Sequence, residues 1–264
     1  MLIGLSTYAF FWRTSSRNPS PITLEEMLAN TRALGADLLQ ICDYAPLDNM
    51  SPRELIRVSQ AAKDLDLTLE LGTRGMRPTH LRRYLEIAEL LGAHLVRSMV
   101  QTAPGEPTIA EVPSLLEQVL PAYASQQVEL ALETYEQLPT ADLVRLVATV
   151  DHPSLGIVLD PGNCVAALEM PQDVIDRTAP YVKNLHVKDF AFSRRNGWVG
   201  FTYAGCPLGE GLLDYDYLVE KTRPIDRGIN QVIEHWLPWT DNISETTRLE
   251  EMWTKHNLDY LRSK

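Results

Sequence analysis

The chain has 264 residues and a formal net charge of −11, from 35 acidic and 24 basic side chains. An acidic chain is a poor partner for a phosphate backbone, so we expect no nucleic-acid ligand. The sequence starts without a basic, then apolar leader and has no apolar run of about 18 residues, which predicts a cytoplasmic protein without membrane association. Its three scattered cysteines are too few for a disulfide framework or a Cys-based zinc site.

Apolar runs and helix signals alternate along the first half of the chain. Strands are expected at residues 2–6, 37–43, 67–72 and 94–99, and helices at 23–35, 51–65 and 79–91. Thr23 and Ser51 are the expected N-caps, and Gly35 and Gly92 end their helices. Each predicted helix therefore separates two predicted strands.

The same alternation continues through the second half. Strands are expected at residues 128–133, 155–160, 182–188 and 230–235, and helices at 109–126, 140–150, 171–178, 215–222 and 244–261. Pro121 is expected to kink or break its helix. Residues 189–213 form a long insertion before the last strand.

Eight strand–helix alternations at short spacing predict an α/β fold, a closed (β/α)₈ TIM barrel that occupies residues 1–264 as a single domain. The alternative is an open doubly wound sheet. No Gly-rich dinucleotide fingerprint follows the first strand, which disfavours that alternative.

Four predicted strands end in a side chain that can bind a metal: Glu133, Asp160, His186 and Glu234. The carboxyl ends of barrel strands meet at one mouth, so we expect these side chains to converge on one divalent ion. Three carboxylates and one imidazole suit Mn²⁺ best, with Mg²⁺ and Co²⁺ as alternatives and Zn²⁺ less favoured. The other interpretation is that they are core residues in separate ion pairs.

Strand alternation adds further inward-facing candidates. Lys188 shares a face with His186, and by the same logic Glu70, Gln40 and Arg97 point into the barrel. We expect Lys188 to contact the substrate. Glu70 and Arg97 form either a buried structural pair or part of the substrate site.

Two loops also suggest a substrate site. Residues 71–77 carry glycines with Arg74 and Arg77, a composition that can bind an anion, although surface arginines are the alternative. Aromatic side chains that include Trp12 and Trp236 follow the first and eighth strands and could stack on a sugar. Packing or a homodimer contact would also explain these aromatics. Residues 193–198 are expected to form part of a lid or a subunit contact.

The spacing of the four strand-end residues, together with residues 185–189 (Leu-His-Val-Lys-Asp) and 209–214 (Gly-Glu-Gly-Leu-Leu-Asp), resembles the xylose-isomerase-like TIM barrels. That superfamily includes sugar isomerases and epimerases, inosose dehydratases, hydroxypyruvate isomerases and a decarboxylase of 3-oxo sugar acids. The resemblance implies the same metal ligands. In the ketose 3-epimerase members it implies two glutamates in acid–base catalysis, which match Glu133 and Glu234.

We therefore expect a divalent-metal-dependent isomerase or epimerase that acts on a small-molecule carbohydrate, a keto-sugar or related polyol, through an enediolate. The alternative is a decarboxylase or dehydratase of a 3-oxo sugar acid or keto-polyol, by the same chemistry. A protein that only binds sugar or metal is a third hypothesis. An apurinic-endonuclease-like nuclease is disfavoured, because Asn163 stands near an expected metal-binding histidine and no Asp-x-His pair follows the seventh strand.

Overall fold

Eight parallel strands close into a barrel in the computed structural model, which describes all 264 residues. The order around the barrel is β1-β10-β7-β6-β5-β4-β3-β2. These strands are β1 (Ile3–Ser6), β2 (Leu38–Cys42), β3 (Thr68–Gly72), β4 (Leu95–Ser98), β5 (Glu129–Glu133), β6 (Leu155–Leu159), β7 (Val182–Val187) and β10 (Asn230–Ile233). The predicted closed α/β barrel is confirmed.

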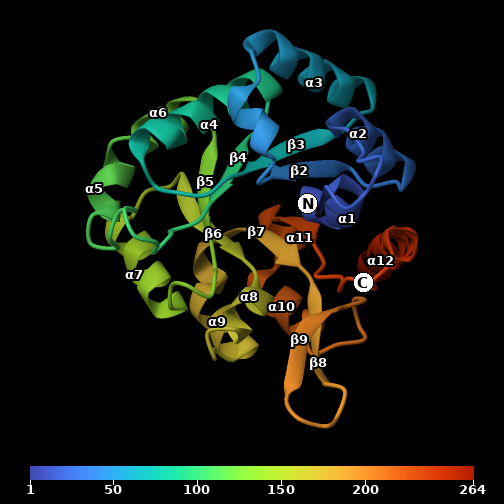
Figure 1. Ribbon diagram of the computed structural model, residues 1–264. Coiled ribbons are helices and arrows are strands. Elements are labelled where there is room, and N and C mark those ends of the chain that lie inside the picture. The colour runs from blue at the N-terminus through green and yellow to red at the C-terminus, as the bar shows by residue number, and fades with distance from the viewer.

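Helices surround the barrel on its outside (Figure 1). The α-helices are α1 (Phe11–Thr14), α2 (Leu24–Ala33), α3 (Pro52–Asp64), α4 (Pro78–Leu91), α5 (Val112–Glu117), α6 (Leu120–Ser125), α7 (Thr140–Val150), α8 (Pro161–Val165), α9 (Pro171–Thr178), α10 (Tyr215–Thr222), α11 (Pro224–Arg227) and α12 (Ile243–Arg262). Three short 3₁₀ helices are η1 (Thr7–Phe10), η2 (Ala45–Asn49) and η3 (Ala179–Tyr181). No helix combines the length and the apolar character needed to cross a membrane.

The helix boundaries follow from local sequence signals. Thr23 and Ser51 each accept a backbone N–H three residues on, and Glu26 and Glu54 complete the two capping boxes. Gly92 ends α4 in the left-handed conformation, with φ of 71°. These caps were expected from the sequence.

Apart from the short elements η2, η3, α8 and α11 and the strands of the insertion, which were not predicted, the structure differs from the expected elements in two places. The helix predicted at 109–126 is two short helices, α5 and α6, and Pro121 lies in the first turn of α6, so the expected break is confirmed. The aromatic segment after β1, expected as a loop, instead forms η1 and α1. Each of these helices has only four residues, which is too short for a helical period of apolar residues to be recognised in the sequence.

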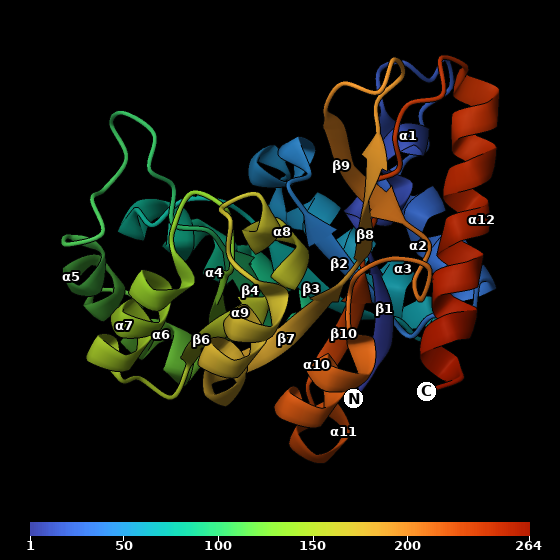
Figure 2. The same cartoon turned by 90° about the horizontal axis from the view of Figure 1, so that it is seen from below.

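The insertion after β7 contains an antiparallel hairpin, β8 (Asp189–Arg194) and β9 (Phe201–Cys206). Figure 2 shows the hairpin projecting beyond the barrel on the side of α1, away from α11. The Asp189 carboxylate anchors the segment that follows, because it accepts the backbone N–H groups of Gly209, Gly211 and Leu213, each at 2.9 Å. This contact explains the Gly-Glu-Gly-Leu-Leu-Asp sequence next to the barrel.

Strand alternation divides the buried residues into two groups. On β7, Leu185 and Val187 belong to the apolar core between the barrel and its helices. Asn184 and His186 are equally buried but form hydrogen bonds with side chains from β2 and β3 inside the barrel. The barrel interior is therefore polar where β7 faces β2 and β3.

Candidate metal and substrate site

The four strand-end residues lie together at the barrel mouth. Glu133 ends β5, Asp160 follows β6 and caps α8, His186 lies on β7, and Glu234 follows β10. Their donor atoms all lie within 4.8 Å of one another, and all four residues are buried. The strands β5, β6, β7 and β10 are neighbours in the barrel, which explains the convergence.

Buried carboxylate oxygens in this cluster suit a bound cation. Glu133 Oε2 and Asp160 Oδ2 each lie beside one buried cationic side chain, whereas Glu234 Oε1 is buried without a hydrogen-bond donor. A buried acceptor without a donor is rare in folded proteins and requires an explanation. Three carboxylates and one imidazole form a donor set that can hold a divalent ion.

Two buried cations contact the cluster. Lys188 Nζ lies 2.6 Å from Asp160 Oδ2 and 3.2 Å from Glu234 Oε2. Arg97 Nε lies 2.8 Å from Glu133 Oε2. Lys188 directly follows β7. Lys188 and Arg97 both point into the barrel, as expected from strand alternation.

These contacts favour the ionised form of each carboxylate and oppose the effect of burial. Burial alone would raise the pKa of Glu133, but Arg97 and His186 outweigh burial and lower it to about 2. Burial raises the pKa of Asp160 to about 6, against the opposing effect of Lys188. The pKa of Glu234 is lowered, because His186 and Lys188 outweigh burial. Glu133 and Glu234 are therefore negatively charged at neutral pH.

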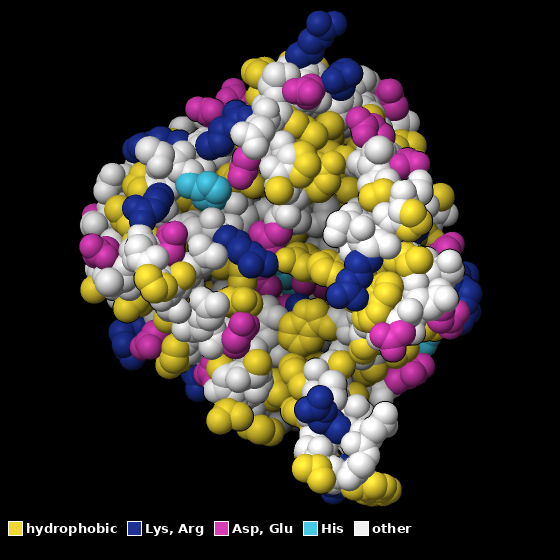
Figure 3. All heavy atoms as spheres, in the orientation of Figure 1, with side chains coloured by type: hydrophobic (Ala, Val, Ile, Leu, Met, Phe, Trp, Pro, Cys, Tyr) yellow, Lys and Arg dark blue, Asp and Glu magenta, His cyan; other side chains and the backbone are white.

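The cluster opens into a cavity of about 270 Å³ at the mouth of the barrel. Charged and aromatic side chains line it: Tyr8, Arg74, Arg97, Met99, Glu133, Tyr135, Glu136, Asn163, Lys188, Glu234 and Trp236. Figure 3 shows basic side chains on both sides of the central hollow and acidic side chains inside it. A small polar molecule in this cavity would meet the cluster and several cations at once.

Arg74 reaches the cavity from the loop after β3, as its sequence position suggested. Arg74 Nη2 lies 3.0 Å from Asp43 Oδ2 and donates to Tyr8 Oη at 2.8 Å. Its side chain is 43% exposed, so it can still meet a ligand. Asp43 was not a candidate from the sequence, although it directly follows β2 as the cluster residues follow their strands.

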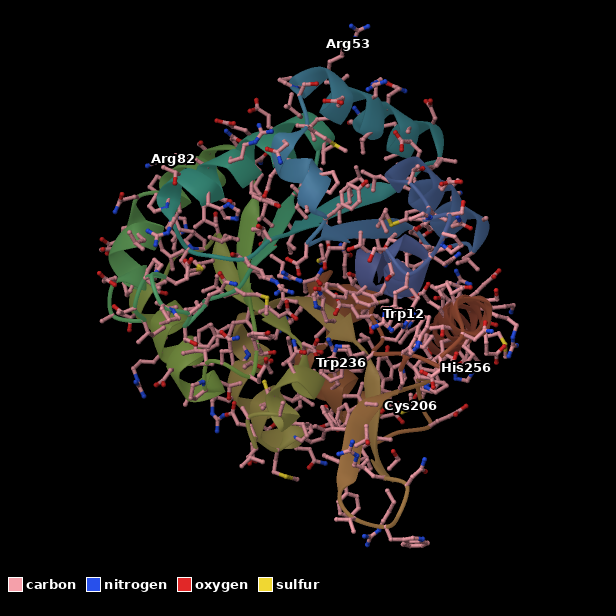
Figure 4. The ribbon with its side chains drawn as sticks, viewed as in Figure 1. Trp12, Arg53, Arg82, Cys206, Trp236 and His256 are labelled. Carbon is pink, nitrogen blue, oxygen red and sulfur yellow. The ribbon has the colours of Figure 1, made fainter.

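The two tryptophans occupy different positions. The ring of Trp236 lies 4.2 Å from Lys188 Nζ and lines the main cavity. Trp12 lies on the side of α12 (Figure 4) and lines a separate cavity, where its Nε1 donates to the Leu237 carbonyl at 2.8 Å. Trp236 can therefore contact a ligand beside the cluster, whereas Trp12 packs behind it.

Glu70 and Arg97 do not form the buried pair that was one of the two interpretations of these residues. Glu70 accepts hydrogen bonds from three amide side chains deeper in the barrel, and it does not line the cavity. Arg97 pairs in register with Gly72, two residues beyond Glu70 on β3, and so lies one layer nearer the mouth. Strand alternation predicts that both side chains point into the barrel, but it does not predict how deep in the barrel each side chain lies.

The sequence of this chain is similar to that of known proteins. Residues 3–264 match the family model of the xylose isomerase-like TIM barrel. The chain is 55% identical to the 3-oxo-isoapionate decarboxylase of Pectobacterium atrosepticum over 261 residues, which cover 99% of this chain and 95% of that protein.

Solved structures share the fold at low sequence identity. D-psicose 3-epimerase from Clostridium cellulolyticum H10 with D-tagatose has a TM-score of 0.75 and 15% identity, covering 100% of this chain and 99% of that one. A xylose isomerase-like TIM barrel protein from Mycobacterium smegmatis in complex with magnesium has a TM-score of 0.70 and 17% identity, covering 97% and 96%.

Proposed function

Because this chain belongs to the family of xylose isomerase-like TIM barrels, we propose that it is a divalent-metal-dependent decarboxylase of a small 3-oxo sugar acid. The decarboxylase at 55% identity supports this alternative better than the isomerase or epimerase that we expected from the sequence. The solved epimerases, at 12–17% identity, bear on the fold alone. The acid named for the relative, 3-oxo-isoapionate, is the first substrate to test.

One observation carries the proposal: three cationic side chains line the same cavity as the carboxylate cluster. A neutral ketose needs no fixed cation beyond the metal, whereas a sugar acid brings a carboxylate that must be paired. Arg97 is already saturated by Glu133, Asp43 and the Thr73 carbonyl. Arg74 also contacts Asp43 and Tyr8, but its side chain is half-exposed, so it is the cation best placed to pair with the substrate carboxylate.

The reaction requires negative charge to be stabilised on an oxygen. The bond between the carboxylate carbon and the α carbon breaks, and its electron pair forms a double bond to the ketone carbon. The ketone oxygen becomes an enolate oxygen, CO₂ leaves, and one proton is then added to the α carbon. A divalent ion held by Glu133, Asp160, His186 and Glu234 would supply Lewis-acid stabilisation of that oxygen.

Side chains that line the cavity supply the other contributions to the reaction. Lys188 stays protonated, because Asp160 and Glu234 raise its pKa in spite of burial, and it places a fixed positive charge beside the reacting atoms. Glu234 is ionised and its Oε2 accepts a hydrogen bond from Lys188 Nζ, so it orients that ammonium group, and the proton added to the α carbon comes from water. Arg97 holds Glu133 ionised. Trp236 restricts water on the side of Lys188.

The test measures CO₂ from 3-oxo-isoapionate with chelator-treated protein resupplied with Mn²⁺. We expect CO₂ and the decarboxylated sugar in equal amounts, with one deuterium bound to the former α carbon in D₂O. D-psicose and D-tagatose serve as comparison substrates and should show neither epimerisation nor solvent exchange. If the protein epimerises these ketoses and releases no CO₂ from the acid, the proposed decarboxylase activity is wrong and the protein is an epimerase.

A further inference from the structure

A chain of buried polar side chains lies below the cluster and has no part in the mechanism above. It consists of Gln40 on β2, Glu70 on β3, Asn184 on β7 and Asn230 on β10. Polar groups in a barrel interior cost free energy unless they are hydrogen-bonded. Their contacts lead directly to one of the four cluster residues.

Glu70 fixes the orientation of the Gln40 amide. Glu70 Oε2 accepts from Gln40 Nε2 at 3.0 Å and from Asn184 Nδ2 at 2.9 Å, and Glu70 Oε1 accepts from Asn230 Nδ2 at 2.8 Å. The two Glu70 oxygens thus face the NH₂ groups of three amide side chains, and the NH₂ end of Gln40 is one of them. The Gln40 carbonyl oxygen consequently points the other way.

That oxygen contacts the ring of His186. Gln40 Oε1 lies 2.7 Å from His186 Nε2, and a carbonyl oxygen can only accept, so Nε2 carries a proton. In neutral imidazole the other nitrogen then has the free lone pair. Nδ1 lies 3.2 Å from Glu133 Oε1 and 3.5 Å from Glu234 Oε1, and therefore faces the cluster.

We propose that Gln40, held by Glu70, is a positioning residue that fixes the tautomer and ring orientation of His186 so that Nδ1 binds the metal. This inference rests on the metal dependence in the proposed function. Hydrogen-bond partners of ligating histidines typically contribute 10- to 100-fold to metal affinity. Gln40 belongs to β2, three strands away from β7 around the barrel, so the fold itself supplies this contact.

The experiment is a double-mutant cycle read as Mn²⁺ affinity by calorimetry. Gln40→Met keeps the side-chain length but removes the acceptor, and should raise the Mn²⁺ dissociation constant about 10- to 100-fold. In a His186→Ala background the same substitution should change it less than about twofold, because Gln40 acts through His186. An equal loss of affinity in both backgrounds would overturn the inference and assign Gln40 a general structural role.

Gln231→Met is the matched control. Gln231 is also buried on a barrel strand, but its side chain accepts from Tyr215 Oη at 2.8 Å and forms no hydrogen bond with a cluster residue. This variant should lower stability and leave Mn²⁺ affinity unchanged. Wild-type protein that binds no Mn²⁺ would overturn both this inference and the metal dependence. Coupling between Gln40 and His186 without CO₂ release would support the inference and reject the proposed reaction.

Discussion

Arg97 Nε lies 2.8 Å from Glu133 Oε2, and both side chains are almost completely buried. The same guanidinium reaches Asp43 Oδ2 at 3.4 Å and the Thr73 carbonyl at 2.8 Å. Arg97 therefore links the loops after β2 and β3 to the cluster residue at the end of β5. It neutralises charge that the fold would otherwise bury without a partner.

Replacing Arg97 by Met should destabilise the protein by about 3–5 kcal/mol, because Glu133 would remain buried and lose its main counter-charge. Denaturant unfolding of metal-free protein measures this change. Arg145→Met is the control, since Arg145 is 73% exposed and pairs with Asp142 at the surface, where such pairs contribute at most about 1 kcal/mol. A loss below 1 kcal/mol for Arg97→Met would show that this ion pair contributes little.

Lys188→Met should lower kcat for decarboxylation about 10²- to 10³-fold, because it removes the fixed charge beside the reacting atoms. Steady-state kinetics on 3-oxo-isoapionate, with Mn²⁺ saturating, checks this. Lys183→Met is a matched control, because Lys183 lies on β7, the strand that Lys188 follows. Its Nζ pairs with Glu129 Oε1 at a distance of 2.5 Å, and it does not line the cavity. Comparable rates for the two variants would remove Lys188 from the mechanism.

The barrel and the cluster were predictable for the same physical reason. Parallel strands place their carboxyl ends at one mouth, so residues such as Asp160 and Glu234 meet although 74 positions separate them. The depth of each side chain in the barrel and the contacts between loops were not predictable in this way. Arg97 and Glu70 share a direction but lie in different layers, and the contact of Arg74 with Asp43 depends on two loop conformations.

Arg74→Met should raise KM for the acid about 10- to 100-fold, because a charged hydrogen bond contributes about 1.5–3 kcal/mol. Stability should change little, since the side chain is half-exposed. Arg77→Met is the control from the same loop, as Arg77 is 55% exposed and lies 3.9 Å from Glu106. If the KM of both variants matches that of wild type, the substrate carboxylate binds elsewhere.

Removal of divalent metal should abolish turnover, and Mn²⁺ should restore it. A ligand at 100 times its dissociation constant stabilises the native state by about 2.7 kcal/mol, which corresponds to a rise in Tm of about 5 °C for a chain of this size. Asp160→Asn should eliminate most of that rise, because it removes one anionic ligand of the cluster. An equal Mn²⁺-dependent rise in this variant would locate the ion at another site.

Stability should also depend on the protonation of Glu250, which is buried on α12 away from the cluster. Its two carboxylate oxygens accept the backbone N–H groups of Trp12 and Arg13, at 2.6 and 3.1 Å. Burial raises its pKa from 4.5 to about 7, against these hydrogen bonds and Arg13. Between these two values the folded state binds more protons than the unfolded state, so stability falls as pH rises.

Glu250→Gln should remove this contribution to the pH dependence. From pH 4.5 to pH 8 the wild type should lose up to about 3 kcal/mol more of its unfolding free energy than the variant. Urea unfolding at several pH values measures the difference. The variant loses one backbone acceptor, so its stability at pH 4.5 is lower than that of the wild type, and only the slope tests the prediction. Glu251→Gln, at the exposed neighbouring position, should keep the wild-type slope. If Glu250→Gln keeps it too, Glu250 is ionised throughout this range in the folded protein.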